Sequence, residues 1–275
     1  MTAFTDATAV RPLGGGRYAV AVDPVWSVGG IPNGGYVLAL LLRAALDPEG
    51  PAAGHPHPMA TSAHFLAPAA PGPAEVVVEP LRNGRSVTSL RATLVQDGTP
   101  RVAALVTAGL LTGGEAQWSD GVVPPVAPVE QCLASAPEVP GGQMRVDLLE
   151  VVDLRLDPAH LGWTRGAPAG EMVQRGHARM RDGDAPDPLA LAVFADALPP
   201  VPFALTGPGG WAPTVELTFL LRALPADGWV TTDVSGRLVR EGWFDETADL
   251  YDSAGHLVAQ SRQLAKVKLG PSRVG

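Results

Sequence analysis

Cysteine and lysine are both scarce in this chain of 275 residues. The only cysteine is Cys132, and the lysines are Lys266 and Lys268. A single cysteine excludes an internal disulfide and a cysteine-rich zinc site. The net charge is -8, and no run of Lys or Arg offers a basic stripe for phosphates. We therefore expect no nucleic-acid partner.

Long hydrophobic runs are missing as well. The longest apolar stretches lie around Tyr36–Leu42 and Leu189–Ala195, far short of the about 20 residues that span a bilayer. Met1–Gly16 lacks the basic start and apolar core of a signal peptide. We therefore expect a cytoplasmic protein without a membrane span.

Several catalytic motifs are also absent. There is no G-x-S-x-G sequence, so nothing indicates the nucleophile elbow of an α/β-hydrolase. Gly14–Tyr18 lacks the G-x-G-x-x-G spacing and leads into a strand-like run, which excludes a dinucleotide-binding turn. None of the six histidines stands at a metal-binding spacing. We expect no metal site and no cofactor.

What the sequence does have is an internal duplication. Apolar helices are predicted over Asn33–Leu46 and Asp187–Leu198, and strand-like runs follow each of them. Val102 and Val258, each followed by Ala, correspond at an offset of 258 − 102 = 156. A similar order at a nearly constant offset indicates two related units.

Breaker residues divide these units. Residues 112–145 are rich in Pro, Gly and Ala without periodicity, which predicts a linker. The units are then residues 1–111 and 146–275. Asp97-Gly98 and Ser253–Gly255 each join two strand-like runs, and such short turns indicate antiparallel hairpins. Because both helices are apolar nearly all round, we expect an α+β fold in which antiparallel sheet encloses each helix.

Asp196 is the strongest candidate for chemistry. In the predicted helix it shares a stripe with Leu189, Ala192 and Val193, where a buried carboxylate is unfavourable without a partner or a function. A partly exposed Asp at the end of the helix, before Pro199, explains the sequence equally well. Position alone leaves both interpretations open.

Other polar residues carry weaker signals. Thr214 and Gln263 lie on strand-like segments, where ordinary strand residues are the simpler interpretation. Gly34 and Gly35 open the first helix, where free backbone N–H groups could bind an oxyanion. A tight turn with close packing is the alternative for these glycines.

The motifs together resemble one family. The segments "HFLAPAAPG", "VEPLRNGRS", "VFADALP", "PTVELTFLLR" and "GHLVAQSRQLAKV" are similar to those of the TesB-like, type II acyl-CoA thioesterases, which have a double hotdog fold. The resemblance covers Trp26–Leu111 and Val146–Val267. It implies that residues 1–111 and 146–275 each form one hotdog unit.

The resemblance also implies a site. In that family an Asp, a Thr and a Gln position the hydrolytic water, and by local match these fall on Asp196, Thr214 and Gln263. Thr218 is the alternative threonine. The family's paired glycines match Gly34 and Gly35, which are expected to bind substrate. The candidates for holding coenzyme A are Arg85 and Arg82.

The expected function is hydrolysis of an acyl-CoA thioester to free acid and coenzyme A. A non-catalytic acyl-CoA or acyl-chain binding protein on the same fold is the alternative. A hydratase ranks lower, because no helix carries the Asp/His-type pair that such chemistry uses. Hotdog units commonly pair further, so a homodimer or higher homo-oligomer is expected.

Overall fold

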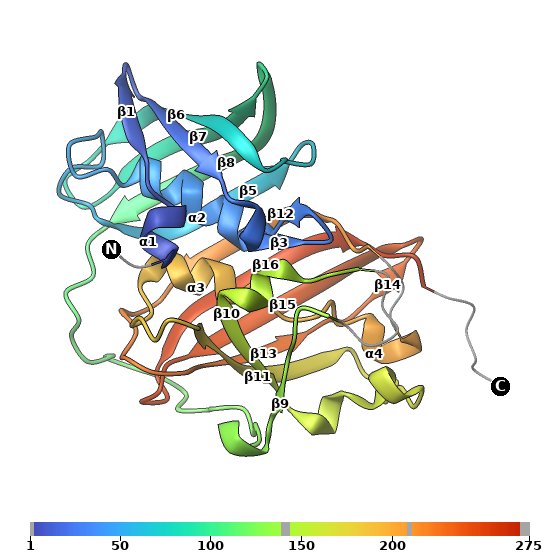
Figure 1. Cartoon of the computed structure of the whole chain (residues 1–275). Coiled ribbons are helices and arrows are strands. Elements are labelled where there is room, and N and C mark those ends of the chain that lie inside the picture. The colour runs from blue at the N-terminus through green and yellow to red at the C-terminus, as the bar shows by residue number, and fades with distance from the viewer. Residues whose placement is uncertain (1–2, 139–143, 208–210, 270–275) are drawn as a thin grey trace.

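The protein consists of two halves, each with one helix lying against curved antiparallel sheet (Figure 1). The computed structural model describes residues 3–138, 144–207 and 211–269. The helices are α1 (Ala3–Ala7), α2 (Gly34–Ala45), α3 (Pro188–Phe194) and α4 (Phe203–Thr206). Short 3-10 turns occupy Pro24–Trp26, Val129–Gln131, Asp147–Glu150, Pro158–His160 and Gly162–Arg165.

The strands divide between the halves. Those of the first half are β1 (Arg11–Gly14), β2 (Arg17–Val22), β3 (Ser27–Val28), β4 (Ile31–Pro32), β5 (His57–Phe65), β6 (Gly72–Asn83), β7 (Thr88–Gln96) and β8 (Thr99–Gly109). Those of the second half are β9 (Leu133–Ala134), β10 (Val152–Leu156), β11 (Val173–Met180), β12 (Thr214–Leu221), β13 (Val230–Ser235), β14 (Val239–Arg240), β15 (Trp243–Tyr251) and β16 (Leu257–Lys266).

One continuous sheet joins the halves. Its order is β1-β2-β6-β7-β8-β5-β12-β16-β15-β13-β11-β10-β9, with β14 on β15. The halves meet where β5 pairs with β12, and there Ser62 lies opposite Thr218. The numbers of these two residues differ by 218 − 62 = 156, which is the offset predicted between the units. Ser62 thus lies opposite its own counterpart in the second half. The two halves are therefore related by a local two-fold arrangement at the β5–β12 seam.

Helix α2 forms because its start is capped and its whole surface is covered. The Asn33 side chain accepts a hydrogen bond from Tyr36 N, as a helix cap does. Ten of the residues of α2 are buried. The β6, β7 and β8 strands pack against the helix, and it contacts α3 of the other half. The burial predicted from its apolar sequence is confirmed.

Helix α3 is shorter than the sequence predicts. Asp187 caps it and Pro188 opens it as expected, but the helix ends at Phe194. Asp196 therefore lies in the turn beyond the helix, with its N–H bonded to Val193 O. The prediction that Asp196 lies on a helical stripe is therefore wrong. The helix ends before this residue, and Asp196 is hydrogen-bonded to Asn33 and Gly35 of the first half.

The predicted hairpins are present. Asp97 and Gly98 join β7 to β8 with positive φ angles of 50° and 71°, and the turn at Ser253–Gly255 joins β15 to β16. The segment predicted as a linker contains β9, which pairs with β10 of the second half. Within the described residues, no helix has the length and hydropathy needed to cross a membrane.

Candidate active site

Asp196 lies at the junction of the two halves, against the first turn of α2. Its Oδ2 accepts hydrogen bonds from Gly35 N at 3.1 Å and from Asn33 Nδ2 at 3.0 Å. Asn33 Nδ2 also donates to the backbone oxygen of Asp196 at 2.8 Å. The positive end of a helix stabilises a negative group placed there. The sequence of the first half thus builds the environment of a carboxylate from the second.

The surroundings of Asp196 act on its pKa in opposite directions. The pKa of the carboxyl is raised from 3.8 to about 6, because burial outweighs the hydrogen bonds from the N–H groups of Gly35 and Gly34, which lower it. The side chains of Gln263 and Asn33 lower this pKa further. The result is a carboxyl that is mainly ionised at neutral pH yet basic enough to accept a proton.

Gln263 connects Asp196 to a threonine. It lies on β16, is 7% exposed and accepts a 2.7 Å hydrogen bond from Thr214 Oγ1 at its Oε1. Because the hydroxyl proton of Thr214 is used in this bond, the oxygen lone pairs remain available to accept a hydrogen bond from water. The structure thus brings together Asp196, Thr214 and Gln263, the three residues expected from the resemblance.

Glu246 is a fourth member of the cluster, and the sequence analysis missed it. Its Oε1 accepts a 2.6 Å hydrogen bond from Gln263 Nε2, and its Oε2 accepts one of 3.1 Å from Val201 N. Burial raises the pKa of Glu246 from 4.5 to about 7. The Val201 N–H lowers that pKa, the charge of Asp196 raises it, and Gln263 lowers it. The sequence did contain a signal for Glu246, since a carboxylate is unusual at a strand position that faces inward.

Gly34 and Gly35, at the start of α2, allow other parts of the chain to approach this helix closely on two sides. A Cβ on Gly34 would lie 2.9 Å from Asp196 Oδ2 and 3.1 Å from Phe65 Cζ. A Cβ on Gly35 would lie 2.3 Å from Ala192 O of α3. Gly35 therefore permits α2 to pack on α3, and Gly34 keeps space open beside the carboxylate. Since Gly35 N–H is bonded to Asp196, it is not free in this structure.

The four residues of the cluster differ in how deeply they are buried. Asp196 and Thr214 are half-buried, whereas Gln263 and Glu246 are 7% and 5% exposed. The cluster therefore has a less buried part, Asp196 and Thr214, and a more buried part, Gln263 and Glu246. Such an arrangement can hold one water molecule between a proton acceptor and a hydrogen-bonding hydroxyl.

Comparison with known proteins identifies the family. The N-terminal domain of acyl-CoA thioesterases matches residues 22–109, and the C-terminal domain matches residues 129–267. The chain belongs to the acyl-CoA thioesterase family. It is 36% identical to the Mycobacterium tuberculosis protein Rv0499, over 96% of this chain and 98% of that protein.

Solved structures agree with this family. A Thermobifida fusca protein described as a candidate thioesterase II is 38% identical, covers 98% of each chain and superposes with a TM-score of 0.88. A hot dog protein from Alicyclobacillus acidocaldarius is 24% identical and has a TM-score of 0.83, covering 98% of this chain and 100% of its own. The predicted double hotdog fold is confirmed.

Two candidates of the sequence analysis have hydrogen-bond partners outside this cluster. Thr218 Oγ1 donates to Glu216 Oε1, which also accepts from Ser62, so this threonine bonds to a carboxylate outside the cluster. Arg85 lies in the β6–β7 turn, where its carbonyl oxygen is 3.3 Å from His55 Nε2, in the loop after α2.

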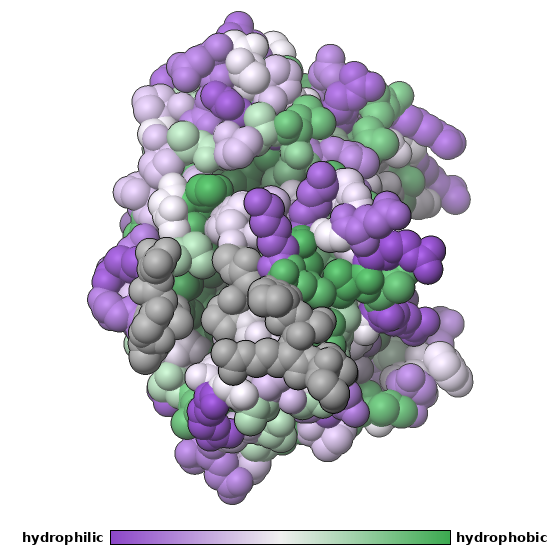
Figure 2. Space-filling view, turned by 90° about the vertical axis from the view of Figure 1, so that its right-hand side faces the viewer, coloured by the Kyte–Doolittle hydropathy of each residue, from purple (hydrophilic) through white to green (hydrophobic). Residues whose placement is uncertain are grey.

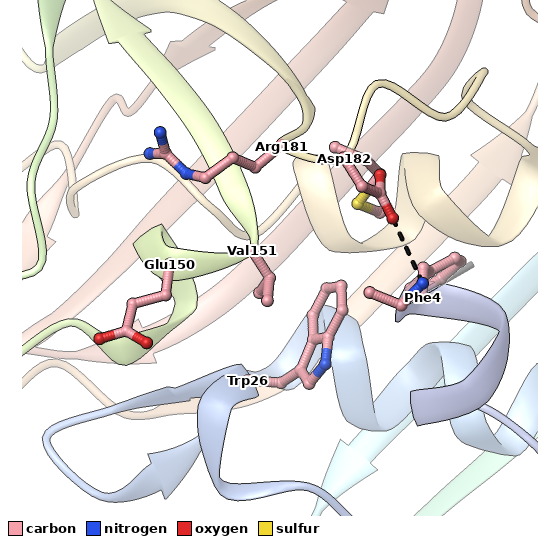
Figure 3. A pocket seen from close by; sticks show the side chains of 8 residues that line it. Phe4, Trp26, Glu150, Val151, Arg181 and Asp182 are labelled. Atoms are coloured by element: carbon pink, nitrogen blue, oxygen red, sulfur yellow. Dashed lines mark hydrogen bonds between the residues drawn. The ribbon is translucent and has the colours of Figure 1, made fainter.

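A hollow of about 290 Å³ lies elsewhere on the surface (Figure 3). Its walls include Phe4 and Trp26 of the first half and Val151 and Arg181 of the second. Arg181 donates to backbone oxygens, so its guanidinium is already engaged. The hollow lies between the two halves, and none of the cluster residues lines it.

Two further features concern what could bind. No group of three or more His, Cys, Asp or Glu is placed to hold a metal ion in the part of the chain that the structure describes.

Hydrophobic side chains gather among polar ones on the side of the molecule seen in Figure 2. Near Thr214 the exposed apolar residues are Trp211, 41% exposed, and Leu264, 42% exposed.

Proposed function

We propose that the protein hydrolyses acyl-CoA thioesters, with Asp196 as the general base. The observation that carries the proposal is the hydrogen-bonded set of Asp196, Gln263 and Thr214 at the junction of the halves. It contains a proton acceptor with a pKa of about 6 and a hydroxyl beside it. Membership of the acyl-CoA thioesterase family supports the same reaction.

In the proposed reaction a water oxygen attacks the thioester carbonyl carbon, and Asp196 accepts the proton that the water loses. The new C–O bond forms as the carbonyl oxygen becomes negatively charged. When this intermediate collapses, the C–S bond breaks and coenzyme A leaves as a thiolate. The proton held by Asp196 then returns to the thiolate, which restores the ionised carboxylate.

Each neighbour has a separate part in this step. Thr214 accepts a hydrogen bond from the water and so aims its lone pair at the carbonyl. Gln263 holds Thr214 through its oxygen and the carboxylates through its nitrogen. We further propose that Gly34 and Gly35 serve substrate binding indirectly: their N–H groups hold Asp196, and their missing side chains leave room for the thioester.

The decisive experiment measures thiol release from a panel of acyl-CoAs, from acetyl to palmitoyl and including phenylacetyl. The Asp196→Asn variant should remain folded and lose about 10²- to 10⁴-fold in turnover, the range for removing a general base. Asp249→Asn is the matched control, because Asp249 is on β15 outside the cluster and accepts from Gln260. Its turnover should equal that of the wild type.

Full activity of Asp196→Asn would overturn the assignment of the base. No thiol release from any acyl-CoA by a folded wild-type protein would overturn acyl-CoA hydrolysis. Binding of the same acyl-CoAs without turnover would then favour the alternative, an acyl-CoA binding protein.

A further inference from the structure

The reaction above leaves one ionisable group of the cluster without a part. Glu246 is 5% exposed, and its side chain is on the inward face of β15 beside Gln263 of β16. Among the described residues, no cation acts on Glu246 or on Asp196. A buried carboxylate without a cationic partner destabilises the folded protein unless hydrogen bonds compensate. Its hydrogen bonds therefore indicate what it does.

These hydrogen bonds determine how the amide of Gln263 is oriented. The two ends of a glutamine amide differ, since Oε1 only accepts and Nε2 only donates. Both oxygens of Glu246 accept hydrogen bonds, one from Gln263 Nε2 and one from Val201 N. An ionised carboxylate cannot donate a hydrogen bond. If the amide were turned so that Oε1 faced Glu246, two acceptors would meet, and this orientation is therefore excluded. The excluded orientation would also remove the bond from Thr214 to Oε1.

We propose that Glu246 is a positioning residue that orients the Gln263 amide, and through it Thr214 and Asp196, for the attack of water. This inference rests on the proposed thioesterase reaction. Glu246 and Gln263 are buried, whereas Asp196 and Thr214 are half-buried. It acts through another residue and does not itself contact the substrate.

The same chain of contacts makes the two carboxyls titrate as a pair. The charged groups that act on Glu246 are Asp196, across Gln263, and Asp245, adjacent on β15. The pKa of Asp196 is about 6 and that of Glu246 about 7, and two such values belong to the pair jointly. Wild-type activity should therefore rise with the loss of two protons across this range, because orientation needs one carboxylate ionised and catalysis needs the other.

The first test is the pH dependence of kcat in Glu246→Gln and in the Asp249→Asn control. Glutamine retains the size of the side chain but presents an N–H group to either Val201 N or Gln263 Nε2, so one bond is lost. We expect kcat to fall about tenfold to a hundredfold, as for a hydrogen bond to a charged group, with KM unchanged. We also expect the acid limb to change from a two-proton to a one-proton slope. Asp249→Asn should retain the wild-type kcat and slope.

The second test does not depend on turnover. In protein labelled with 15N at glutamine side chains, the Nε2 signals of Gln263 should be shifted and slow to exchange in the wild type. Glu246→Gln should remove this protection, and Asp249→Asn should retain it. Loss of protection in an enzyme that hydrolyses no thioester would support the positioning of Gln263 while the proposed reaction fails. Unchanged protection, or an unchanged two-proton slope in Glu246→Gln, would overturn the inference.

Discussion

Glu246 and Gln263 lie opposite each other on β15 and β16, joined by a 2.6 Å hydrogen bond, where the first half has the apolar pair Leu90 and Val106. The correspondence follows from the offset between the halves, since 246 − 90 = 156 and 263 − 106 = 157. Leu90 and Val106 are 0% and 1% exposed. The two halves share a backbone plan, but at this position only the second carries polar side chains.

The first prediction concerns the pH dependence of turnover. Since Asp196 must be ionised to accept a proton and its pKa is about 6, kcat/KM should fall as pH drops below neutrality and be small at pH 5. Initial rates of thiol release between pH 5 and 8.5 measure this dependence, with protein stability checked at each pH. A rate that stays level down to pH 4.5 would contradict the role of Asp196 as the base.

The second prediction concerns stability. A carboxyl whose pKa is raised on folding contributes stability below its unfolded pKa and loses it as pH rises through the folded value. For Asp196 this window lies between 3.8 and about 6. Asp196→Asn should therefore raise Tm relative to the wild type at pH 8, by about 2 to 4 °C per kcal/mol. The difference should shrink towards pH 4, and calorimetry at both pH values tests it.

The third prediction separates the two threonines. Thr214→Val removes the hydroxyl next to Gln263 and should lower kcat about tenfold or more, as expected for a lost hydrogen bond in the transition state. Thr218→Val removes a bond to Glu216 and should leave kcat close to that of the wild type. The reverse result would assign the site threonine to position 218.

The fourth prediction separates two adjacent glycines. Gly35→Ala places a Cβ 2.3 Å from Ala192 O, so the backbone must shift, and unfolding should become easier by about 1 to 3 kcal/mol. Gly34→Ala meets side-chain ends, Asp196 Oδ2 and Phe65 Cζ, so activity should fall more than stability. Gly114→Ala is the control, because nothing lies within 4 Å of that position. Equal loss of stability at positions 34 and 35 would contradict this distinction.

The fifth prediction concerns Arg85, the arginine expected to hold coenzyme A. Because an arginine guanidinium binds phosphate groups well, Arg85→Ala should raise KM for acyl-CoA severalfold, and an unchanged KM would count against Arg85. Arg82→Ala, in the same hairpin, is the companion variant. A severalfold rise in KM for either variant would indicate that coenzyme A extends along this hairpin, and acyl-CoA titrations of both variants decide the question.

The sequence by itself determined the elements, because local chemistry specifies them. Asn33 and Asp187 cap their helices as side-chain acceptors do, and Asp97-Gly98 adopts the positive φ angles that a tight hairpin needs. The apolar surface of α2 required burial on all sides. The repeated order of elements indicated two related units, and the family resemblance implied that each is a hotdog. Three of the residues in the cluster, Asp196, Thr214 and Gln263, were likewise found from motifs.

Only the tertiary structure decided how those residues act. It placed Asp196 just beyond the end of α3, where Asn33 and Gly35, some 160 positions earlier in the chain, donate hydrogen bonds to its carboxylate. It also brought Glu246 next to Gln263, since cross-strand pairing joins residues that no local pattern relates. Burial is a property of the assembled sheet and helices, so the raised pKa values of Asp196 and Glu246 exist only in the folded protein.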